Sequence, residues 1–76
     1  MAIEHGAESK ERVVFTIEEL TDHGWAHPMH HQSRENAFWQ ARARSDADGR
    51  TYRVISRDQH LVCLVTSQGS DCWELD

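Results

Sequence analysis

The hydrophobic pattern of this chain changes its period twice, and the order of those periods constrains the fold more than any other feature. Residues 12–20 alternate apolar and polar side chains, as a half-buried strand does. Residues 33–45 follow the period of a helix. The strand period then returns in three further runs, residues 51–57, 60–66 and 71–75. The pattern therefore predicts a strand, a helix and a meander of three strands.

That order predicts an α+β fold in which a four-stranded, mainly antiparallel sheet carries one helix packed on one face. With 76 residues, 38% of them apolar and 28% charged, the chain has the size and composition of one small globular domain. We expect residues 1–11 to form a flexible polar tail and residues 12–76 to form the α+β domain. Residues 21–32 contain Gly24 and Pro28 and are predicted to be a long loop.

The predicted helix has recognisable signals at its ends. Ser33 is a good N-cap residue, Glu35 suits the positive N-terminal end, and Gly49 can close the helix. Trp39 points away from the apolar stripe, so we expect it to cover the flank of the helix or to be exposed. The stripe itself is narrow and can cover one face of a sheet; it consists of Ala37, Phe38 and Ala41.

The meander predicts apolar side chains on both faces of the sheet. We assume two-residue turns at Asp58-Gln59 and Gln68-Gly69, which set the register of the strands. One face, the more uniformly apolar, is assigned to the helix and carries Tyr52, Val54, Leu61, Cys63, Val65 and Cys72. The second face carries Ile55, Val62, Leu64, Trp73 and Leu75, interleaved with Arg53, Arg57, His60 and Asp71. The loop of residues 21–32, a second copy of the chain or a partner protein must cover this second face.

The leading functional hypothesis is therefore a small non-enzymatic protein-binding module, such as a regulator or inhibitor of another protein. Its partner would be another protein or a second copy of the chain. An apolar surface beside arginines is typical of recognition surfaces, and Trp and Arg are frequent among the residues that contribute most to binding. The predicted partner-binding residues are Trp39, Arg42, Arg53, Ile55, Arg57, Val62, Leu64 and Trp73.

Histidines in the predicted loop suggest an alternative function. Imidazole binds zinc, copper and nickel, and clustered histidines titrate at about pH 6–7, so this loop could bind a metal or respond to pH. The spacing matches no zinc motif, and the predicted register places Cys63 and Cys72 diagonally on the sheet. Four of the six histidines form the candidate metal site: His23, His27, His30 and His31.

The two cysteines match no disulfide scaffold, and we predict that Cys63 and Cys72 are reduced and buried. Residues 1–12 contain no apolar segment of the kind found in a secretory signal. No stretch approaches the ~20 apolar residues of a membrane helix. We therefore expect a cytoplasmic protein that does not use a membrane.

Catalysis and nucleic-acid binding have less support in the sequence. The chain has no Gly-rich phosphate loop and no hydrolase or metalloprotease motif, so we expect neither enzyme activity nor a cofactor. Six arginines gather in residues 34–57, and with Trp39 and Trp73 they suggest a third hypothesis, a nucleic-acid-binding accessory protein. The net charge of −5 argues against it, because nucleic-acid-binding domains are usually basic.

Overall fold

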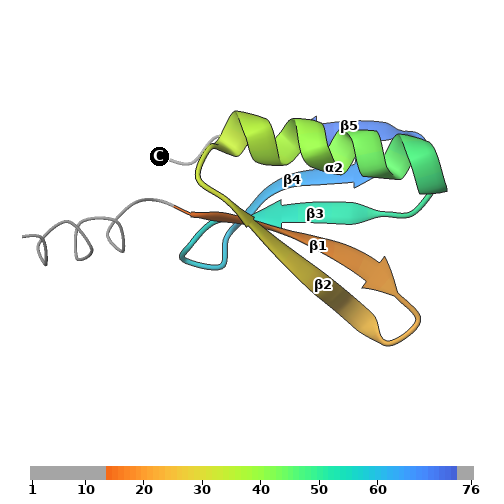
Figure 1. Ribbon diagram of the computed structural model, residues 1–76, viewed down its shortest axis with the longest axis horizontal. Helices are drawn as coiled ribbons and strands as arrows, with labels where there is room; N and C mark the ends of the chain where they lie inside the picture. The colour runs from red at the N-terminus through yellow and green to blue at the C-terminus, as the bar shows by residue number, and fades with distance from the viewer. Residues whose placement is uncertain (1–13, 74–76) are drawn as a thin grey trace, which may run out of the picture.

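The computed structural model describes residues 14–73, in which one α-helix packs on one face of a five-stranded sheet (Figure 1). The elements are β1 (Phe15–Thr21), β2 (Gly24–His31), α2 (Arg34–Asp48), β3 (Tyr52–Ile55), β4 (Leu61–Thr66) and β5 (Gly69–Cys72). The strand order is β2-β1-β3-β4-β5, and all neighbouring strands are antiparallel. The predicted α+β class, with one helix on an antiparallel sheet, is confirmed. The predicted tail, residues 1–11, and Leu75 lie outside the described residues.

The sheet has five strands, and the prediction of four is wrong because residues 21–32 are not a loop throughout. They contain β2, which forms a hairpin with β1. The turn is stabilised by the Thr21 side chain, whose Oγ1 accepts a hydrogen bond from the His23 N–H at 3.1 Å and donates one to the Gly24 carbonyl at 2.8 Å. The β1–β2 pair extends the sheet well beyond the helix (Figure 1).

A bulge lets β2 contain a proline. The register between β1 and β2 shifts between Ile17 and Glu19, and His27 takes a positive φ of 56° just before Pro28. Proline cannot donate to a strand ladder and is found in sheets mainly at edges and bulges. Because β2 is an edge strand and bulges at this point, Pro28 is compatible with a strand, although it favoured the prediction of a loop.

Helix α2 begins and ends where its capping residues predict. The Ser33 Oγ accepts a hydrogen bond from the Asn36 N–H at 3.1 Å, and Gly49 closes the helix in the left-handed conformation, with φ 74°. Ala37 and Ala41 face the sheet and are completely buried. Their short side chains let the helix lie close to the strands. No helix in residues 14–73 has the length and apolar composition needed to cross a membrane.

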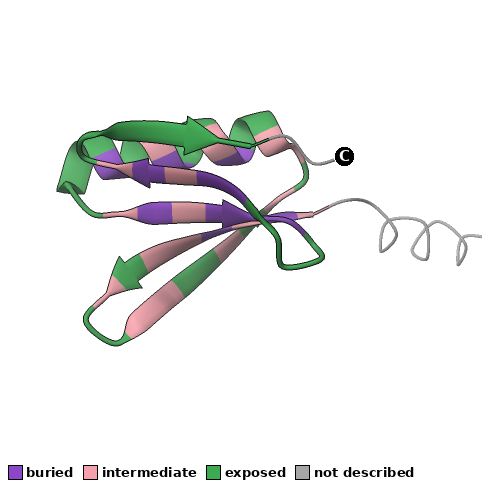
Figure 2. Ribbon diagram, turned by 180° about the vertical axis from the view of Figure 1, so that it is seen from behind, coloured by how far each residue is buried: buried purple, intermediate pink, exposed green. Residues whose placement is uncertain are grey.

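The core lies between α2 and the three central strands (Figure 2). Met29 and Phe38 are partly buried and pack against it. Within the described residues, neither edge strand, β2 or β5, contributes a buried residue. The buried cluster consists of Phe15, Ile17, Ala37, Ala41, Tyr52, Val54, Val62, Cys63 and Val65.

The loop between β3 and β4 is longer than the predicted two-residue turn, and this changes which residue is buried. The Ser56 N–H donates a hydrogen bond to the His60 carbonyl at 2.8 Å, which leaves three residues in the loop. The register then slips by one residue next to Val62. Val62 belongs to the core and Leu61 is 41% exposed, whereas the predicted register assigned Leu61 to the helix face and Val62 to the other.

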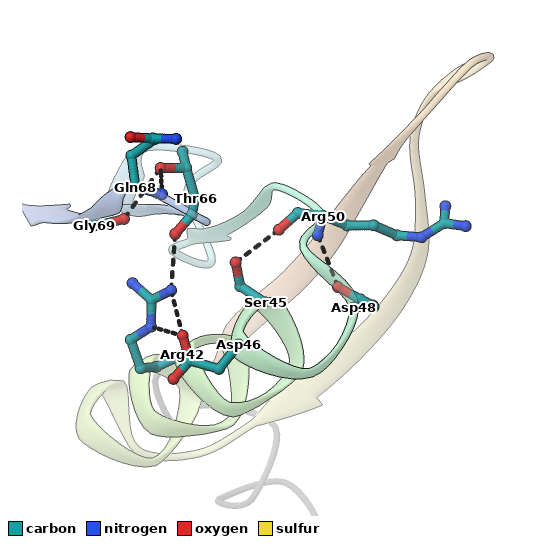
Figure 3. A network of polar contacts seen from close by, with 8 residues as sticks. All are labelled: Arg42, Ser45, Asp46, Asp48, Arg50, Thr66, Gln68 and Gly69. Atoms are coloured by element: carbon teal, nitrogen blue, oxygen red, sulfur yellow. Dashed lines mark hydrogen bonds and ion pairs between the residues drawn. The ribbon is translucent and has the colours of Figure 1, made fainter.

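The second half of α2 is fastened to the strand ends by polar contacts (Figure 3). The Arg42 Nη2 donates to the Thr66 carbonyl at 2.7 Å and also pairs with Asp46 at 2.7 Å. The Ser45 Oγ donates to the Arg50 carbonyl at 2.7 Å. These contacts fix how far the helix can slide or turn on the sheet.

The burial of Ile17 predicts a large loss of stability when its side chain is shortened. Ile17 is 1% exposed in β1, so Ile17→Val should lower the free energy of unfolding by about 1 kcal/mol and Ile17→Ala by about 3 kcal/mol. Leu20→Ala is the matched control, because Leu20 lies in the same strand but is 44% exposed. Urea denaturation measures all three variants, and an Ile17→Ala effect no larger than that of the control would contradict the core described above.

Candidate functional site

The predicted partner-binding residues do not form a single surface. Ile55 is 5% exposed and Val62 is completely buried, so neither offers much area to a partner. Arg53 and Leu64 stand directly opposite each other on β3 and β4 and are half-buried. No helix and no second sheet of residues 14–73 packs on the sheet face that carries Arg53. Its predicted role in recognition stays a prediction.

The other predicted residues lie on the helix, at the end of β5 and in a loop. Arg42 is turned toward the β4–β5 turn through its bond to the Thr66 carbonyl. Arg57 is exposed in the loop between β3 and β4. Trp39 on α2 and Trp73 just after β5 are 58% and 46% exposed. The two tryptophans are therefore the predicted residues with the most accessible aromatic surface.

A shallow groove lies beside these tryptophans, between the N-terminal half of α2 and strands β4 and β5. Its volume is about 410 Å³. The groove is formed where the first turns of the helix pass the strand pair that ends the sheet. Its lining residues are Arg34, Glu35, Phe38, Cys63 and Cys72.

Both tryptophans are tied to this lining. The Phe38 and Trp39 rings meet edge to face, with centroids 4.8 Å apart and planes at 72°. The Arg34 Nη2 donates a hydrogen bond of 2.7 Å to the Trp73 carbonyl, which joins the start of the helix to the end of β5. Arg34 and Phe38 are four residues apart and so lie on the same side of the helix. We call this site the tryptophan groove, because its lining residues Phe38 and Cys72 are each followed by a tryptophan.

The groove also contains a disulfide. Cys63 and Cys72 are bonded to each other, which corrects the prediction of two reduced, buried thiols. Cys63 in β4 is 1% exposed, whereas Cys72 in β5 is exposed. One sulfur is therefore part of the core and the other belongs to an edge strand.

The position of one turn explains why the predicted pairing failed. The β4–β5 turn closes between Thr66 and Gly69, one residue earlier than predicted. Thr66 Oγ1 accepts the Gln68 N–H at 3.0 Å, and Gly69 takes a φ of 149°, which glycine tolerates because it lacks a Cβ. Cys72 then pairs with Cys63 instead of with Val65, so the two cysteines stand opposite each other instead of diagonally.

Most of the arginines of residues 34–57, which suggested nucleic-acid binding, form contacts within the fold. Arg50 forms an ion pair with Glu19 at 2.8 Å, and Arg53 forms one with Glu18 at 2.6 Å. Arg34 and Arg42 donate to backbone carbonyls of the β4–β5 region, as described above. Their donors serve contacts between elements, which weakens the hypothesis of a nucleic-acid interface.

The Arg53 guanidinium also lies over an aromatic ring. Its central carbon is 4.3 Å from the centroid of the Trp25 ring, while the Glu18 carboxylate holds it from the neighbouring strand. Trp25 comes from β2, in the segment 21–32 that is one of the three predicted alternatives for covering the second sheet face. Its ring stacks on Arg53, which belongs to that face, so this aromatic ring and this cation contact each other.

The candidate metal ligands are not brought together. His23 lies in the β1–β2 turn, and the other three, His27, His30 and His31, are spread along β2. His30 stands opposite Thr16 and His31 opposite Phe15, so these two neighbours point to opposite faces. Among residues 14–73, no three His, Cys, Asp or Glu side chains are grouped as metal ligands would be.

The most perturbed titratable group lies at the other end of α2 from the groove. The Tyr52 hydroxyl donates a 2.6 Å hydrogen bond to Asp48 Oδ2. Burial, followed by this hydrogen bond, raises the pKa of Tyr52 to about 12. The same bond, with a second from the Arg50 N–H, lowers the pKa of Asp48. The pair joins the end of the helix to β3 and has no place in the tryptophan groove.

Comparison with known proteins adds no family to this description. No protein-family model matches the chain, and no curated protein or solved structure is significantly similar to it. The functional argument therefore depends on the geometry of the site.

Sequence reasoning missed part of the groove for identifiable reasons. The helical pattern places Phe38 in the buried stripe, and Arg34 is one of six arginines in residues 34–57. Their spacing of four, with Trp39 next to Phe38, was the available signal of a shared aromatic and basic helix flank. The sequence offered no comparable signal that Cys72 would complete the opposite wall.

The Tyr52–Asp48 contact predicts an unusual alkaline titration. Tyr52 is the one tyrosine of the chain, so tyrosinate absorbance reports it alone. We expect a midpoint near 12 in the folded protein instead of 10.0. A raised pKa means that the neutral phenol stabilises the fold fully below pH 10.0, and that this contribution is lost as the pH rises toward 12.

Two variants test the cause of this shift. Asp48→Asn should lower the titration midpoint, because it removes the charged acceptor of the Tyr52 hydroxyl. Asp46→Asn is the control: it keeps the helix length and the Tyr52–Asp48 bond but removes the ion pair with Arg42. A midpoint at the ordinary tyrosine value in the folded wild-type chain would be incompatible with the contact.

Proposed function

We propose that this chain is a small protein-binding module that holds an apolar side chain of its partner in the tryptophan groove. The observation that carries the proposal is the position of Trp39 and Trp73. Residues 14–73 expose four large apolar side chains, and the two that are tryptophans each follow a groove-lining residue in the chain, Trp39 after Phe38 and Trp73 after Cys72. Tryptophan is enriched among the residues that contribute most to protein binding, and clustered exposed apolar surface marks interaction sites.

The composition of the groove supports a protein partner. Phe38 and the disulfide supply apolar walls, while Arg34 and Glu35 supply charged groups at the helix start. An apolar centre with an arginine beside it resembles the anatomy of protein interfaces. The volume of about 410 Å³ is near the lower end of the ~300–1,000 Å³ typical of small-molecule pockets. An open site of this size suits a protruding side chain better than an enclosed ligand.

The charge of the chain favours a basic partner. The net charge is −5 and the sequence pI is about 5.6. Opposite net charges speed association and exclude acidic competitors. A small acidic module that occupies one surface of a larger basic protein would act as its regulator or inhibitor.

The proposal predicts that the two tryptophans dominate binding. A photo-cross-linking amino acid at position 35, which is exposed and lines the groove, with position 20 as the control, should capture a partner in the native host that mass spectrometry identifies. Calorimetry with the purified partner should then show that Trp39→Ala and Trp73→Ala each weaken binding by about tenfold or more. Leu20→Ala should change it by less than about twofold, because Leu20 is exposed on β1, outside the groove.

Two results would overturn this assignment. Equal affinity of the tryptophan variants and the wild-type chain for the captured protein would remove the groove from the interface. A cross-link between two copies of the chain, with a dimer in light scattering that Trp39→Ala dissociates, would replace the basic partner by a second copy.

Salt provides an independent test of the basic partner. Because charges on opposite surfaces are screened within about 8 Å at physiological ionic strength, the association rate should fall steeply between 0.05 and about 0.5 M salt. The dissociation rate should change much less, since it depends mainly on the apolar contacts of the groove. Stopped-flow measurements separate the two rates, and an association rate that is independent of salt would argue against a basic partner.

A further inference from the structure

We propose that the Cys63–Cys72 disulfide is a thiol–disulfide exchange site whose redox state decides whether β5 stays attached to the sheet. The substrate class is a dithiol, which reduces the bond. The inference goes beyond partner binding, because the exchange reaction and the release of β5 need no partner. It begins with the unequal surroundings of the two sulfurs and with how little else holds β5.

The two cysteines differ in access. Cys72 is exposed on an edge strand, whereas Cys63 is 1% exposed in β4. An incoming thiolate therefore reaches the sulfur of Cys72, and the sulfur of Cys63 becomes the leaving group. Both cysteines line the tryptophan groove together with Arg34, so the departing thiolate forms beside a cation. The groove gives the thiol a path to the bond.

Strand β5 has few other attachments. All four of its residues are exposed, so it buries no apolar side chain that would hold it in place. Among residues 14–73 its remaining bonds are the ladder to β4, the Thr66 hydroxyl bond to the Gly69 carbonyl at 3.3 Å, the Arg34 bond to the Trp73 carbonyl, and the bond from the Trp73 N–H to the Val62 carbonyl at 2.8 Å. Edge elements with exposed hydrogen bonds open with the smallest free energies. Loss of the disulfide should therefore release β5 before any other element.

The exchange reaction balances with a dithiol alone. The first thiolate attacks the Cys72 sulfur, a mixed disulfide forms, and the Cys63 thiolate leaves and takes up a proton. The second thiolate of the reductant then attacks the reductant's first sulfur, which is bonded to Cys72 in the mixed disulfide. The Cys72 thiolate leaves and is protonated in turn. Two electrons and two protons pass from the dithiol to the cysteine pair, and the reductant becomes a cyclic or protein disulfide.

Release of β5 would change two surfaces. Trp73 would lose its place beside Arg34, and one wall of the tryptophan groove would move away. The outer edge of β4 would lose its pairing partner and become a free strand edge. The inference that reduction weakens partner binding rests on the proposed function, whereas the exchange reaction and the release of β5 do not.

The first experiment tests the site of attack on the native, oxidised full chain. The monothiol 2-mercaptoethanol is added, the reaction is quenched with acid, and the mixed disulfide is located by peptide mapping. We expect the adduct on Cys72 in about tenfold excess over Cys63, because attack follows access to the sulfur. Equal labelling of both cysteines, or no reaction until denaturant is added, would overturn the assignment.

The second experiment tests the release of β5 by hydrogen exchange with dithiothreitol as the reductant. Exchange in residues 69–73 should become about tenfold faster on reduction, while exchange in residues 52–55 changes by less than about twofold. The double variant Cys63→Ser/Cys72→Ser should behave like the reduced chain, and dithiothreitol should have no effect on it. Unchanged exchange in residues 69–73 would overturn the inference, and so would equal acceleration in β3, which would make the disulfide a global stabiliser.

These measurements are independent of the partner. If β5 is released on reduction but Trp39→Ala and Trp73→Ala bind the captured partner normally, the exchange site stands and the proposed function fails. If the variants lose binding and β5 stays attached on reduction, the proposed function stands and the redox inference fails.

Discussion

The close contact between α2 and the central strands is the interaction on which the rest of the structure depends. It is possible because Ala37 and Ala41, completely buried, place almost no side-chain volume between helix and sheet. The larger Phe38 then lies at the flank, half-buried, where it becomes a wall of the tryptophan groove. Larger side chains at the two alanine positions would lift the helix and take Arg34 out of reach of the Trp73 carbonyl.

Polar contacts at both ends of α2 hold the helix in that position. Arg34 bonds to the carbonyl that follows β5, and the Asp48 carboxylate accepts the Tyr52 hydroxyl from β3. The helix is thus oriented along the strands as well as packed on them, which keeps the start of α2 beside the end of β5, where the groove lies. A site that is formed before a partner arrives needs less ordering on binding. The price of this arrangement is that most arginines are used inside the fold.

The β1–β2 and β4–β5 hairpins have turns of the same type, which the hydrophobic pattern does not indicate. Thr21 and Thr66 each accept a hydrogen bond from the N–H two residues on and donate one to the carbonyl three residues on, at Gly24 and Gly69. Both glycines have positive φ. The shared Thr-x-x-Gly spacing is visible in the sequence and would have indicated β2. The hydrophobic pattern does not indicate β2, because an edge strand with a bulge and no buried residue has almost no period-2 signal.

Signals within a few residues of the sequence are enough to predict the helix and three of the strands. Capping residues set the helix from Ser33 to Gly49. Alternating apolar residues set β1 and β3, and a continuous apolar run sets β4, which together give the α+β class. Three features emerge only when distant segments pack together: the slip that buries Val62, the pairing of Cys63 with Cys72, and the contact of the helix flank with the end of β5. The two groups of features differ in the range of the interactions that set them. Caps and periodicity act over a few residues, whereas register and packing follow from competing contacts between distant segments, in which one residue in a turn changes every pair beyond it.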